Sequence, residues 1–275
     1  MQVPFAKYEG LGNDFVVVDL ERVGAAPTAE QVVHICDRHL GIGADGVLLV
    51  SSSGLRPTMR VINADGSTPE MCGNGIRCVA MHLLRTGRTP TDSRLVIETD
   101  SGPHACRVLY DSDSVEVAMR APSLVPAASP VVADDPVVDA PFDLLGQTVH
   151  VTAVSMGNPH AVLFDDVGPD RAQLAPLLQR HERFPHHANV GFARVLGQEL
   201  LEVSVFERGA GWTQACGTGA CAAAVAAVET GRARRGVPIE VRLPGGPLQI
   251  TVYDAGESIT MTGPARHVFD GVIEL

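Results

Sequence analysis

Lysine is almost absent from this chain: Lys7 is the only one among 275 residues. An enzyme that uses pyridoxal phosphate needs a lysine to form a Schiff base with the cofactor. Lys7 is close to the N-terminus and outside any loop that could cradle a phosphate. We therefore expect the protein to work without a cofactor.

A strong nucleotide-binding motif is also lacking. The stretch from Gly41 to Gly46 resembles a Gly-x-Gly-x-x-Gly fingerprint, which in dinucleotide-binding proteins leads from a strand into a helix. Here the next residues, Val47 to Val50, are themselves typical of a strand. The match is therefore weak.

Basic patches and long apolar runs are missing as well. The formal net charge is −11 and the basic residues are dispersed, so we expect no nucleic-acid partner. The N-terminus has no basic start followed by an apolar stretch. Its nearest apolar run, Phe15 to Val18, is too short to act as an export signal or to span a membrane. We expect a cytoplasmic protein that has no membrane partner.

The six cysteines show no Cys-x-x-Cys pairing of the kind that binds structural zinc. Cys72 and Cys78 are six positions apart, and Cys216 and Cys221 are five apart. We therefore expect no metal site. In a long chain kept in a reducing compartment, the cysteines should remain thiols.

Two of these cysteines open near-identical phrases 144 residues apart, Cys72-Gly-Asn-Gly and Cys216-Gly-Thr-Gly. From Cys72 to Arg88, 7 of 17 positions are identical to those 144 residues later. At the same offset, the position that corresponds to Asn63 is occupied by Glu207. At an offset of 145, Gly12-Asn13 recurs as Gly157-Asn158. The pattern indicates an internal duplication.

The chain is long enough for two cores of about 100 to 150 residues each. Five prolines between Ala121 and Pro141 could neither continue a helix nor lie inside a sheet, so we interpret that stretch as the connection. The sequence predicts an N-terminal domain of residues 1–120, which carries Cys72, and a C-terminal domain of residues 121–263, which carries Cys216.

The clearest predicted helices begin at the two cysteine phrases and end at Gly87 and Gly231. Residues 219–228 are small and apolar on every side, so that helix should be buried all round by a sheet. Short β-branched runs predict strands, namely Val16–Val18, Leu95–Thr99, Val115–Ala118, His150–Val154, Ala161–Phe164 and Leu201–Phe206. The predicted fold is α+β, with two pseudo-symmetric domains that are each a curved sheet or barrel around one central apolar helix.

Cys72 and Cys216 are candidates for proton transfer. A helix N-terminus carries roughly +0.5 of an elementary charge, which should lower the pKa of a cysteine there from about 8.5 toward neutrality. Such a thiol can accept or return a proton near neutral pH. Two such thiols on opposite faces of a tetrahedral carbon could remove a proton from one side and return one to the other, which inverts the configuration of that carbon. The backbone N–H groups at the helix starts would suit the α-carboxylate of an amino acid.

Six phrases together resemble the diaminopimelate epimerase family, and the resemblance runs from end to end. They are Gly10–Phe15, Asn63–Ser67, Glu70–Cys78, Gly157–His160, Glu207–Gly209 and Ala215–Cys221. The resemblance implies a cofactor-independent epimerase that interconverts LL- and meso-diaminopimelate in bacterial lysine and peptidoglycan biosynthesis, as a cytoplasmic homodimer. It also implies that residues 264–275 return to the first domain.

The resemblance also implies roles for single residues. Cys216 would remove the α-proton of the LL substrate and Cys72 would reprotonate the opposite face, with His160 and Glu207 adjusting the thiols. The implied substrate contacts are Asn13, Asn63, Gly73, Asn74, Asn158, Asn189, Glu207, Arg208, Gly217 and Thr218. The chain departs from some relatives at Gly46, where they have a substrate-contacting glutamine, and at Phe269, where they have a tyrosine at the dimer contact.

Other interpretations stay open from the residues alone. Cys36, Cys78, Cys106 and Cys221 fit buried hydrophobic positions. The asparagines after glycine could be turn formers, Glu207-Arg208 a surface pair, and His160 a loop histidine. A proline racemase-like enzyme would share the paired cysteines, although Arg208 suits a second carboxylate that proline lacks. A thiol redox protein or a non-catalytic amino-acid-binding protein is the alternative outside enzymes of this class.

Overall fold

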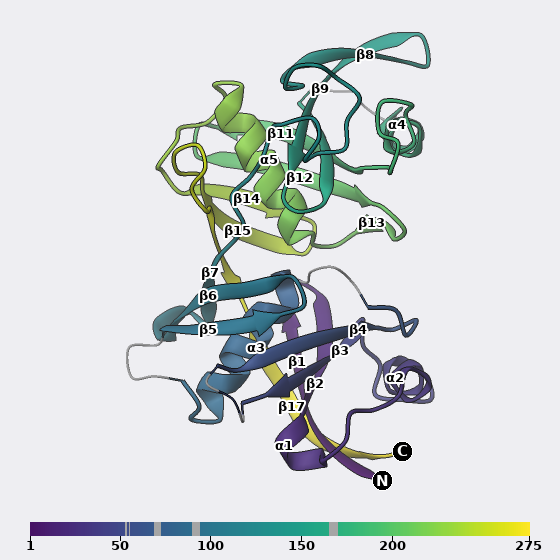
Figure 1. Ribbon diagram of the computed structural model, residues 1–275, viewed down its shortest axis with the longest axis vertical. Helices are drawn as coiled ribbons and strands as arrows, with labels where there is room; N and C mark the ends of the chain where they lie inside the picture. The colour runs from purple at the N-terminus through teal and green to yellow at the C-terminus, as the bar shows by residue number, and fades with distance from the viewer. Residues whose placement is uncertain (53, 55, 69–72, 90–93, 165–169) are drawn as a thin grey trace. The chain divides into compact units, whose positions relative to one another are not determined.

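The computed structural model describes residues 1–52, 54, 56–68, 73–89, 94–164 and 170–275. The chain divides into two compact units. Unit 1 comprises Met1–Ala118 with Thr262–Leu275, and unit 2 comprises Met119–Met261. Each unit has its own helices and strands, shown in Figure 1.

Unit 1 contains three α-helices, one short 3₁₀ helix and a set of strands among its described residues. The helices are α1 (Leu20–Val23), α2 (Ala29–Cys36), α3 (Gly73–Arg85) and the 3₁₀ helix Tyr110–Ser112. The strands are β1 (Gln2–Gly10), β2 (Asn13–Asp19), β3 (Gly46–Ser51), β4 (Thr58–Asn63), β5 (Arg94–Thr99), β6 (Gly102–Leu109), β7 (Ser114–Ala118) and β17 (Arg266–Glu274).

Unit 2 repeats this plan in its described residues. The helices are α4 (Arg171–Gln179) and α5 (Gly217–Glu229). The strands are β8 (Ala140–Leu144), β9 (Gln147–Ser155), β10 (Pro159–Leu163), β11 (Asn189–Gly197), β12 (Leu200–Glu207), β13 (Gly211–Thr213), β14 (Ile239–Leu243) and β15 (Gly246–Thr251). One further strand, β16 (Thr260–Pro264), crosses the boundary between the two units along the chain.

The two sheets have the same pairing pattern. From β1 to β6 the neighbours pair antiparallel, parallel, antiparallel, parallel and antiparallel. The series β9, β10, β11, β12, β14 and β15 follows the same alternation. A flanking antiparallel strand, β17 beside β1 and β8 beside β9, completes each set. The predicted α+β fold with two pseudo-symmetric halves is confirmed.

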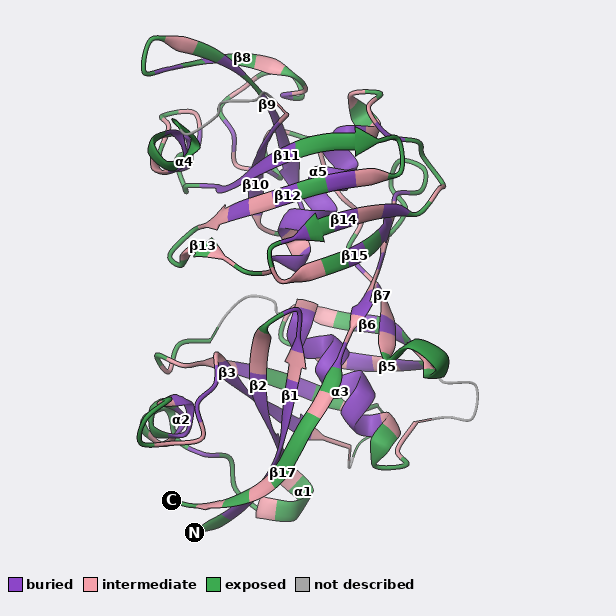
Figure 2. Cartoon of the chain, turned by 180° about the vertical axis from the view of Figure 1, so that it is seen from behind, coloured by how far each residue is buried: buried purple, intermediate pink, exposed green. Residues whose placement is uncertain are grey.

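A central helix fills each sheet. In unit 1, α3 contacts all the strands from β1 to β7 and also β17. In unit 2, α5 contacts β9, β10, β11, β12, β14 and β15. Residues 219–227 of α5 are all buried, and the two helices are largely in the buried colour in Figure 2. The small side chains predicted this enclosure, because a helix without a polar face has no side to present to water.

The ends of the central helices also agree with the sequence. Both α3 and α5 begin at the glycine after a cysteine, and both stop two residues before a glycine. Gly87 and Gly231 have φ values of 71° and 72°, the left-handed conformation that ends a helix at little cost for glycine. The N–H groups of Arg88 and Arg232 donate to the carbonyls of Leu83 and Ala227.

An outer helix covers the other face of each sheet. Helix α2 contacts β3 and β4, and α4 contacts β8 and β11. Thr28 caps α2 with a capping box that involves Gln31. Because the strands are buried on both faces, β3 and β10 are apolar almost without alternation. All six predicted strand runs lie in strands, except that Phe164 falls one residue beyond β10.

Among the described residues, the helices are too short or too polar for any of them to cross a membrane.

We predict that Ala224→Leu lowers the free energy of unfolding by about 1–3 kcal/mol, because α5 is enclosed and the added carbons would overpack its surroundings. Ala224 is 0% exposed. The measurement is urea unfolding followed by circular dichroism. The control is the same change at the exposed Ala25, which should stay within about 0.5 kcal/mol of wild type. Equal losses in the two variants would contradict the enclosure of α5.

Candidate active site

Polar residues gather at one end of the unit 1 sheet. Strand β2 begins at Asn13 and β4 ends at Asn63. Gly46, the first residue of β3, pairs with Phe15 on one side and with Asn63 on the other. The start of β2, the start of β3 and the end of β4 therefore lie at the same end of the sheet.

The equivalent end of the unit 2 sheet also carries polar residues. Asn158 immediately precedes β10, β11 begins at Asn189, and β12 ends at Glu207. His160 of β10 pairs in register with Asn189 of β11. The repeat offsets seen in the sequence, Asn13 with Asn158 and Asn63 with Glu207, thus correspond to equivalent positions in the two sheets.

Each of these ends is joined to the first turn of its central helix through a matching contact. In unit 1, Nδ2 of Asn74 donates to Oδ1 of Asn13 over 3.2 Å. In unit 2, Nδ2 of Asn158 donates to Oγ1 of Thr218 over 3.4 Å. Asn74 and Thr218 occupy the same place in the repeated phrases. The structure therefore brings Asn13 together with Asn74, and Asn158 together with Thr218.

Cys216 is the N-cap residue of α5, and its sulfur accepts a hydrogen bond from the backbone N–H of Gly219 over 3.4 Å. Oγ1 of Thr218 is 3.6 Å from the same sulfur. A Cβ at Gly219 would lie 2.8 Å from a methyl group of Val205 and 3.2 Å from the sulfur. Glycine is needed there because the helix approaches β12 so closely.

The pKa of Cys216 moves in the direction opposite to the predicted one. Burial raises the pKa of the thiol well above its ordinary value, and the charge and hydrogen bond of Glu207 raise it further. The hydrogen bonds from Thr218 and Gly219 lower the pKa but do not compensate. The predicted shift toward neutrality was wrong, because the thiol is only 5% exposed and desolvation outweighs the helix N-terminus. Burial and the negative charge of Glu207 therefore favour the protonated thiol of Cys216 in the free protein.

The other predicted thiol, Cys72, lies outside the described residues. Gly73, which follows it, is the first residue of α3. Asn74 and Gly75 in the same first turn are buried.

His160 is buried in β10, where Nε2 lies 3.0 Å from Oδ1 of Asn158. Burial lowers the pKa of His160 to about 3, and the positive charge of Arg208 acts in the same direction. The imidazole is therefore neutral at pH 7. Its contact is with Asn158, so it acts on the orientation of that amide.

Glu207 and Arg208 point to different partners. Oε1 of Glu207 accepts a hydrogen bond from the hydroxyl of Thr213 over 2.6 Å. The backbone N–H of Arg208 donates to Oδ1 of Asn189 over 2.8 Å, and its Nη1 donates to the carbonyl of His186 over 3.0 Å. Asn189 and Arg208 are thus held together at the ends of β11 and β12.

Asn63 has its own local support in unit 1. Its Nδ2 donates to Oγ of Ser67 over 2.9 Å, and that hydroxyl donates to Oδ1 of Asp65 over 2.6 Å. Asn63 therefore lies at the same end of the sheet as Asn13, at the end of β4 and the start of β2 respectively.

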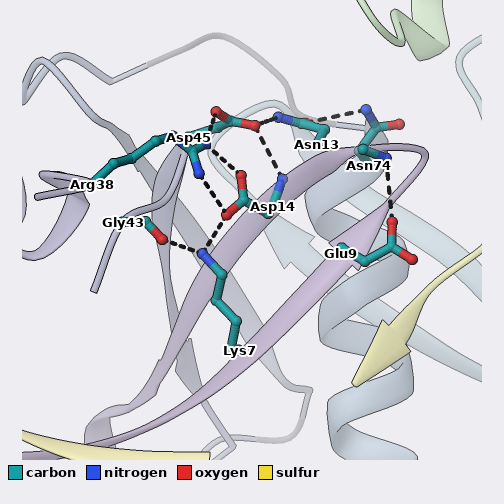
Figure 3. Close-up of polar contacts among 9 residues, drawn as sticks. Lys7, Glu9, Asn13, Asp14, Arg38, Gly43, Asp45 and Asn74 are labelled. Atoms are coloured by element: carbon teal, nitrogen blue, oxygen red, sulfur yellow. Dashed lines mark hydrogen bonds and ion pairs between the residues drawn. The ribbon is translucent and has the colours of Figure 1, made fainter. Parts of the chain in front are cut away.

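Charged residues that the sequence analysis missed surround Asn13, as Figure 3 shows. Nδ2 of Asn13 donates to Oδ2 of Asp45 over 2.6 Å. Arg38 bridges Oδ1 of Asp45 and Oδ1 of Asp14, at 2.8 and 2.7 Å. Lys7, with its side chain 8% exposed, pairs with Asp14. Burial opposes ionisation of Asp14, but the hydrogen bonds from Arg38 and Lys7 prevail and lower its pKa.

Arg77 was also missed. It is 0% exposed, an unusual position for an arginine, and lies on α3. Its guanidinium donates to Oδ1 of Asn74 over 3.0 Å and to the carbonyls of Gly73 and Pro264 over 3.3 and 3.2 Å. Two signals could have found these residues: an arginine within a mostly apolar helix, and Asp45 at the repeat offset of 144 from Asn189.

Gly46 was left out of the predicted site, and the backbone leaves little room there. A Cβ at Gly46 would lie 2.9 Å from the carbonyl oxygen of Ile62 on the neighbouring strand. A side chain at this position would require β3 and β4 to shift.

Lys7 is 6% exposed and its ammonium group is engaged by Asp14 and the carbonyl of Gly43. In the part of the chain that the structure describes, no three His, Cys, Asp or Glu side chains gather closely enough to hold a metal ion.

The fold is shared with solved structures of low sequence identity. A solved structure of a probable proline racemase from Agrobacterium radiobacter superposes with a TM-score of 0.70, at 16% identity, over 99% of this chain and 93% of that chain. The two chains therefore share one fold over almost their whole lengths.

A particular family follows from the sequence comparisons. The family model described as diaminopimelate epimerase matches residues 5–125 and 152–268. A diaminopimelate epimerase from Acaryochloris marina is 46% identical over 100% of this chain and 99% of its own length. One from Synechocystis is 45% identical over the whole of both chains. The chain belongs to the diaminopimelate epimerase family and is an isomerase, as the resemblance predicted.

The buried neutral His160 gives a pH prediction. The unfolded chain binds a proton at this histidine below about pH 6.5, whereas the folded chain binds it only near pH 3. The free energy of unfolding should therefore fall as pH decreases from about 6.5 toward about 3. We expect His160→Gln to reduce the loss of stability between pH 7 and pH 5 in urea unfolding. The exposed His39→Gln is the control and should keep the wild-type slope; equal slopes in all three proteins would refute the assignment.

Proposed function

We propose that this protein interconverts LL- and meso-diaminopimelate without a cofactor, with Cys216 and Cys72 as the two proton-transferring groups. The observation that carries the proposal is the setting of Cys216: a buried thiol that caps the N-terminus of α5, accepts from the backbone N–H of Gly219 and lies near enough to the carboxylate of Glu207 for that charge to raise its pKa. The full-length relatives named diaminopimelate epimerase support the substrate and the reaction. We also propose that the reaction belongs to bacterial lysine and peptidoglycan biosynthesis, as the family resemblance implies.

In the LL-to-meso direction, Cys216 must first lose its proton, and we assign Glu207, whose negative charge acts on the thiol, as the acceptor. The thiolate then takes the α-proton of the substrate, so that the Cα–H bond breaks and an S–H bond forms. The electron pair remains at the α-carbon, next to its carboxylate. Cys72 gives its own proton to the opposite face and is left as a thiolate. In the reverse direction the roles are exchanged, and Cys216 begins as the thiol that the free protein contains.

The first turns of α3 and α5 would bind the α-carboxylate. Backbone N–H groups at a helix N-terminus favour an anion, and the same groups stabilise the charge that spreads into the carboxylate when the α-proton leaves. Gly73 and Asn74 in unit 1, and Gly217 and Thr218 in unit 2, belong to these turns. We assign these four residues to substrate binding.

The other end of the substrate carries an ammonium and a second carboxylate. Arg208 is exposed and its guanidinium suits the carboxylate, while the amides of Asn13, Asn63, Asn158 and Asn189 can pair with either group. Glu207 contributes a negative charge beside Asn189 and Arg208. In this assignment His160 orients Asn158 and carries no charge of its own.

We further propose two catalytic domains, residues 1–120 with 264–275 and residues 121–263, whose boundaries differ from those of units 1 and 2 by two residues. Cys72 belongs to the first and Cys216 to the second. Strand β17 ties the C-terminal residues to β1 within unit 1.

Because Cys36, Cys106 and Cys216 form no disulfides, the chain fits a reducing compartment, and we propose that it is cytoplasmic.

We also propose that two copies associate through β17. Val268, Phe269 and Val272 are 52%, 45% and 62% exposed, which is a high apolar exposure for one strand. Figure 2 shows much of β17 in the exposed colour. A second copy of the same strand is the partner that the family resemblance implies.

We predict that Cys216→Ala and Cys72→Ala each lower kcat for epimerisation by about a thousandfold or more, because each removes one proton-transferring group. The assay follows conversion of LL- to meso-diaminopimelate by chiral chromatography. Cys36→Ala is the matched control, since Cys36 and Cys216 are both 5% exposed, and it should keep near-wild-type activity. Substantial turnover by either variant at a candidate thiol would reject the two-thiol mechanism.

The dimer proposal is tested by Val272→Glu. A buried charge would oppose association, so we expect this variant to sediment as a monomer at concentrations where the wild type is a dimer. Val132→Glu in unit 2 is the matched control, because Val132 and Val272 are both 62% exposed. A monomeric wild type, or a Val272→Glu variant that dimerises as well as the control, would contradict the proposed interface.

A further inference from the structure

Asn13 and Asn74 form the middle of a directional chain of hydrogen bonds in unit 1. The guanidinium of Arg77 donates to Oδ1 of Asn74 over 3.0 Å. Nδ2 of Asn74 donates to Oδ1 of Asn13 over 3.2 Å, and Nδ2 of Asn13 donates to Oδ2 of Asp45 over 2.6 Å. Every bond in the chain runs from Arg77 toward Asp45.

Each end of this series of hydrogen bonds can act in only one way, as a donor or as an acceptor. A guanidinium only donates hydrogen bonds, and a carboxylate only accepts them. An asparagine amide by itself could turn over and exchange its oxygen and nitrogen. With Arg77 at one end and Asp45 at the other, both amides have one orientation that satisfies all three bonds.

Asp45 is itself held firmly. Its Oδ2 also accepts from the backbone N–H of Asp14 over 3.1 Å, and its Oδ1 accepts from Arg38 over 2.8 Å. Arg38 is in turn paired with Asp14, which is paired with the buried Lys7. The four side chains carry two positive and two negative charges, so the cluster is balanced (Figure 3).

Unit 2 lacks this fixed polarity at the equivalent position. Asn158 is joined to the hydroxyl of Thr218 and to the ring of His160, and both of those groups can donate or accept. Asn189 stands at the repeat position of Asp45, and its Oδ1 accepts from the backbone of Arg208. The fixed orientation is therefore a property of unit 1.

We propose that Asp45 and Arg77 are positioning residues that lock the Asn13 and Asn74 amides in one orientation, so that Asn13 presents its remaining N–H to a substrate carboxylate. One N–H of Asn13 is used by Asp45 and its oxygen is used by Asn74, which leaves the second N–H for a ligand oxygen. The consequence for catalysis rests on the proposed function, whereas the locking of the amides does not.

The test compares Asp45→Asn with Glu98→Gln. Both changes turn an arginine-paired carboxylate into the amide of the same shape, and Asp45 and Glu98 have side chains that are 39% and 38% exposed. The pair of Glu98 with Arg56 has no link to Asn13. Any effect that is specific to Asp45→Asn therefore comes from its connection to Asn13 and Asp14.

We expect Asp45→Asn to raise KM for diaminopimelate about tenfold, which corresponds to about 1.4 kcal/mol, with a smaller change in kcat. Side-chain ¹⁵N–¹H spectra should show the Asn13 amide protons exchanging with solvent faster in Asp45→Asn than in wild type. Glu98→Gln should match wild type in both measurements. Arg77→Lys keeps a group that only donates hydrogen bonds. Its KM and its Asn13 exchange rate should lie between those of wild type and those of a folded Arg77→Met variant.

The outcomes separate the two proposals. Unchanged Asn13 exchange in Asp45→Asn would overturn the locking. A KM equal to that of Glu98→Gln despite altered exchange would overturn the proposal that Asn13 presents its N–H to the substrate. If the wild type fails to epimerise diaminopimelate while Asp45→Asn still speeds Asn13 exchange, the proposed function fails and the locked amide stands.

Discussion

Enclosure of each central helix by its own sheet is the constraint on which the rest of the structure depends. A helix such as α5, with alanine and valine on every side, is stable only when strands surround it. Its N-terminus then opens at the end of the sheet where β10 and β11 begin and β12 ends. Thr218 of the first turn meets Asn158 at that end, because both lie where the enclosed helix begins.

The same enclosure decides the charge state of Cys216. A helix N-terminus favours a nearby anion by up to about 2 kcal/mol in favourable geometries. Removing a thiolate from water costs more than that when the sulfur is nearly inaccessible, and the carboxylate of Glu207 adds repulsion. In the proposed mechanism, the protonated Cys216 can return a proton directly, whereas Glu207 must accept the thiol proton before Cys216 can remove one from the substrate.

The sequence could predict whatever local patterns determine. The repeat placed Asn13 with Asn158 and Asn63 with Glu207, and the structure has them at equivalent strand ends. The starts of α3 and α5 and their glycine stops were also predicted, because caps and left-handed glycines are local features. The raised pKa of Cys216 was not predicted, because the burial of its thiol depends on neighbours that are distant in sequence. The cluster of Lys7, Asp14, Arg38 and Asp45 was missed for the same reason: its members are separated by loops and meet only when β2 pairs with β3.

Deuterium incorporation during one turnover tests the central claim, two thiols that act on one carbon, most directly. LL-Diaminopimelate is mixed with the enzyme in heavy water and the reaction is stopped before equilibrium. The account predicts one deuterium at the inverted α-carbon of the meso product and almost none in the remaining LL substrate, because the returned proton comes from a different thiol that has exchanged with solvent. Product that retains the original hydrogen would show that a single group removes and returns it, and would contradict the account.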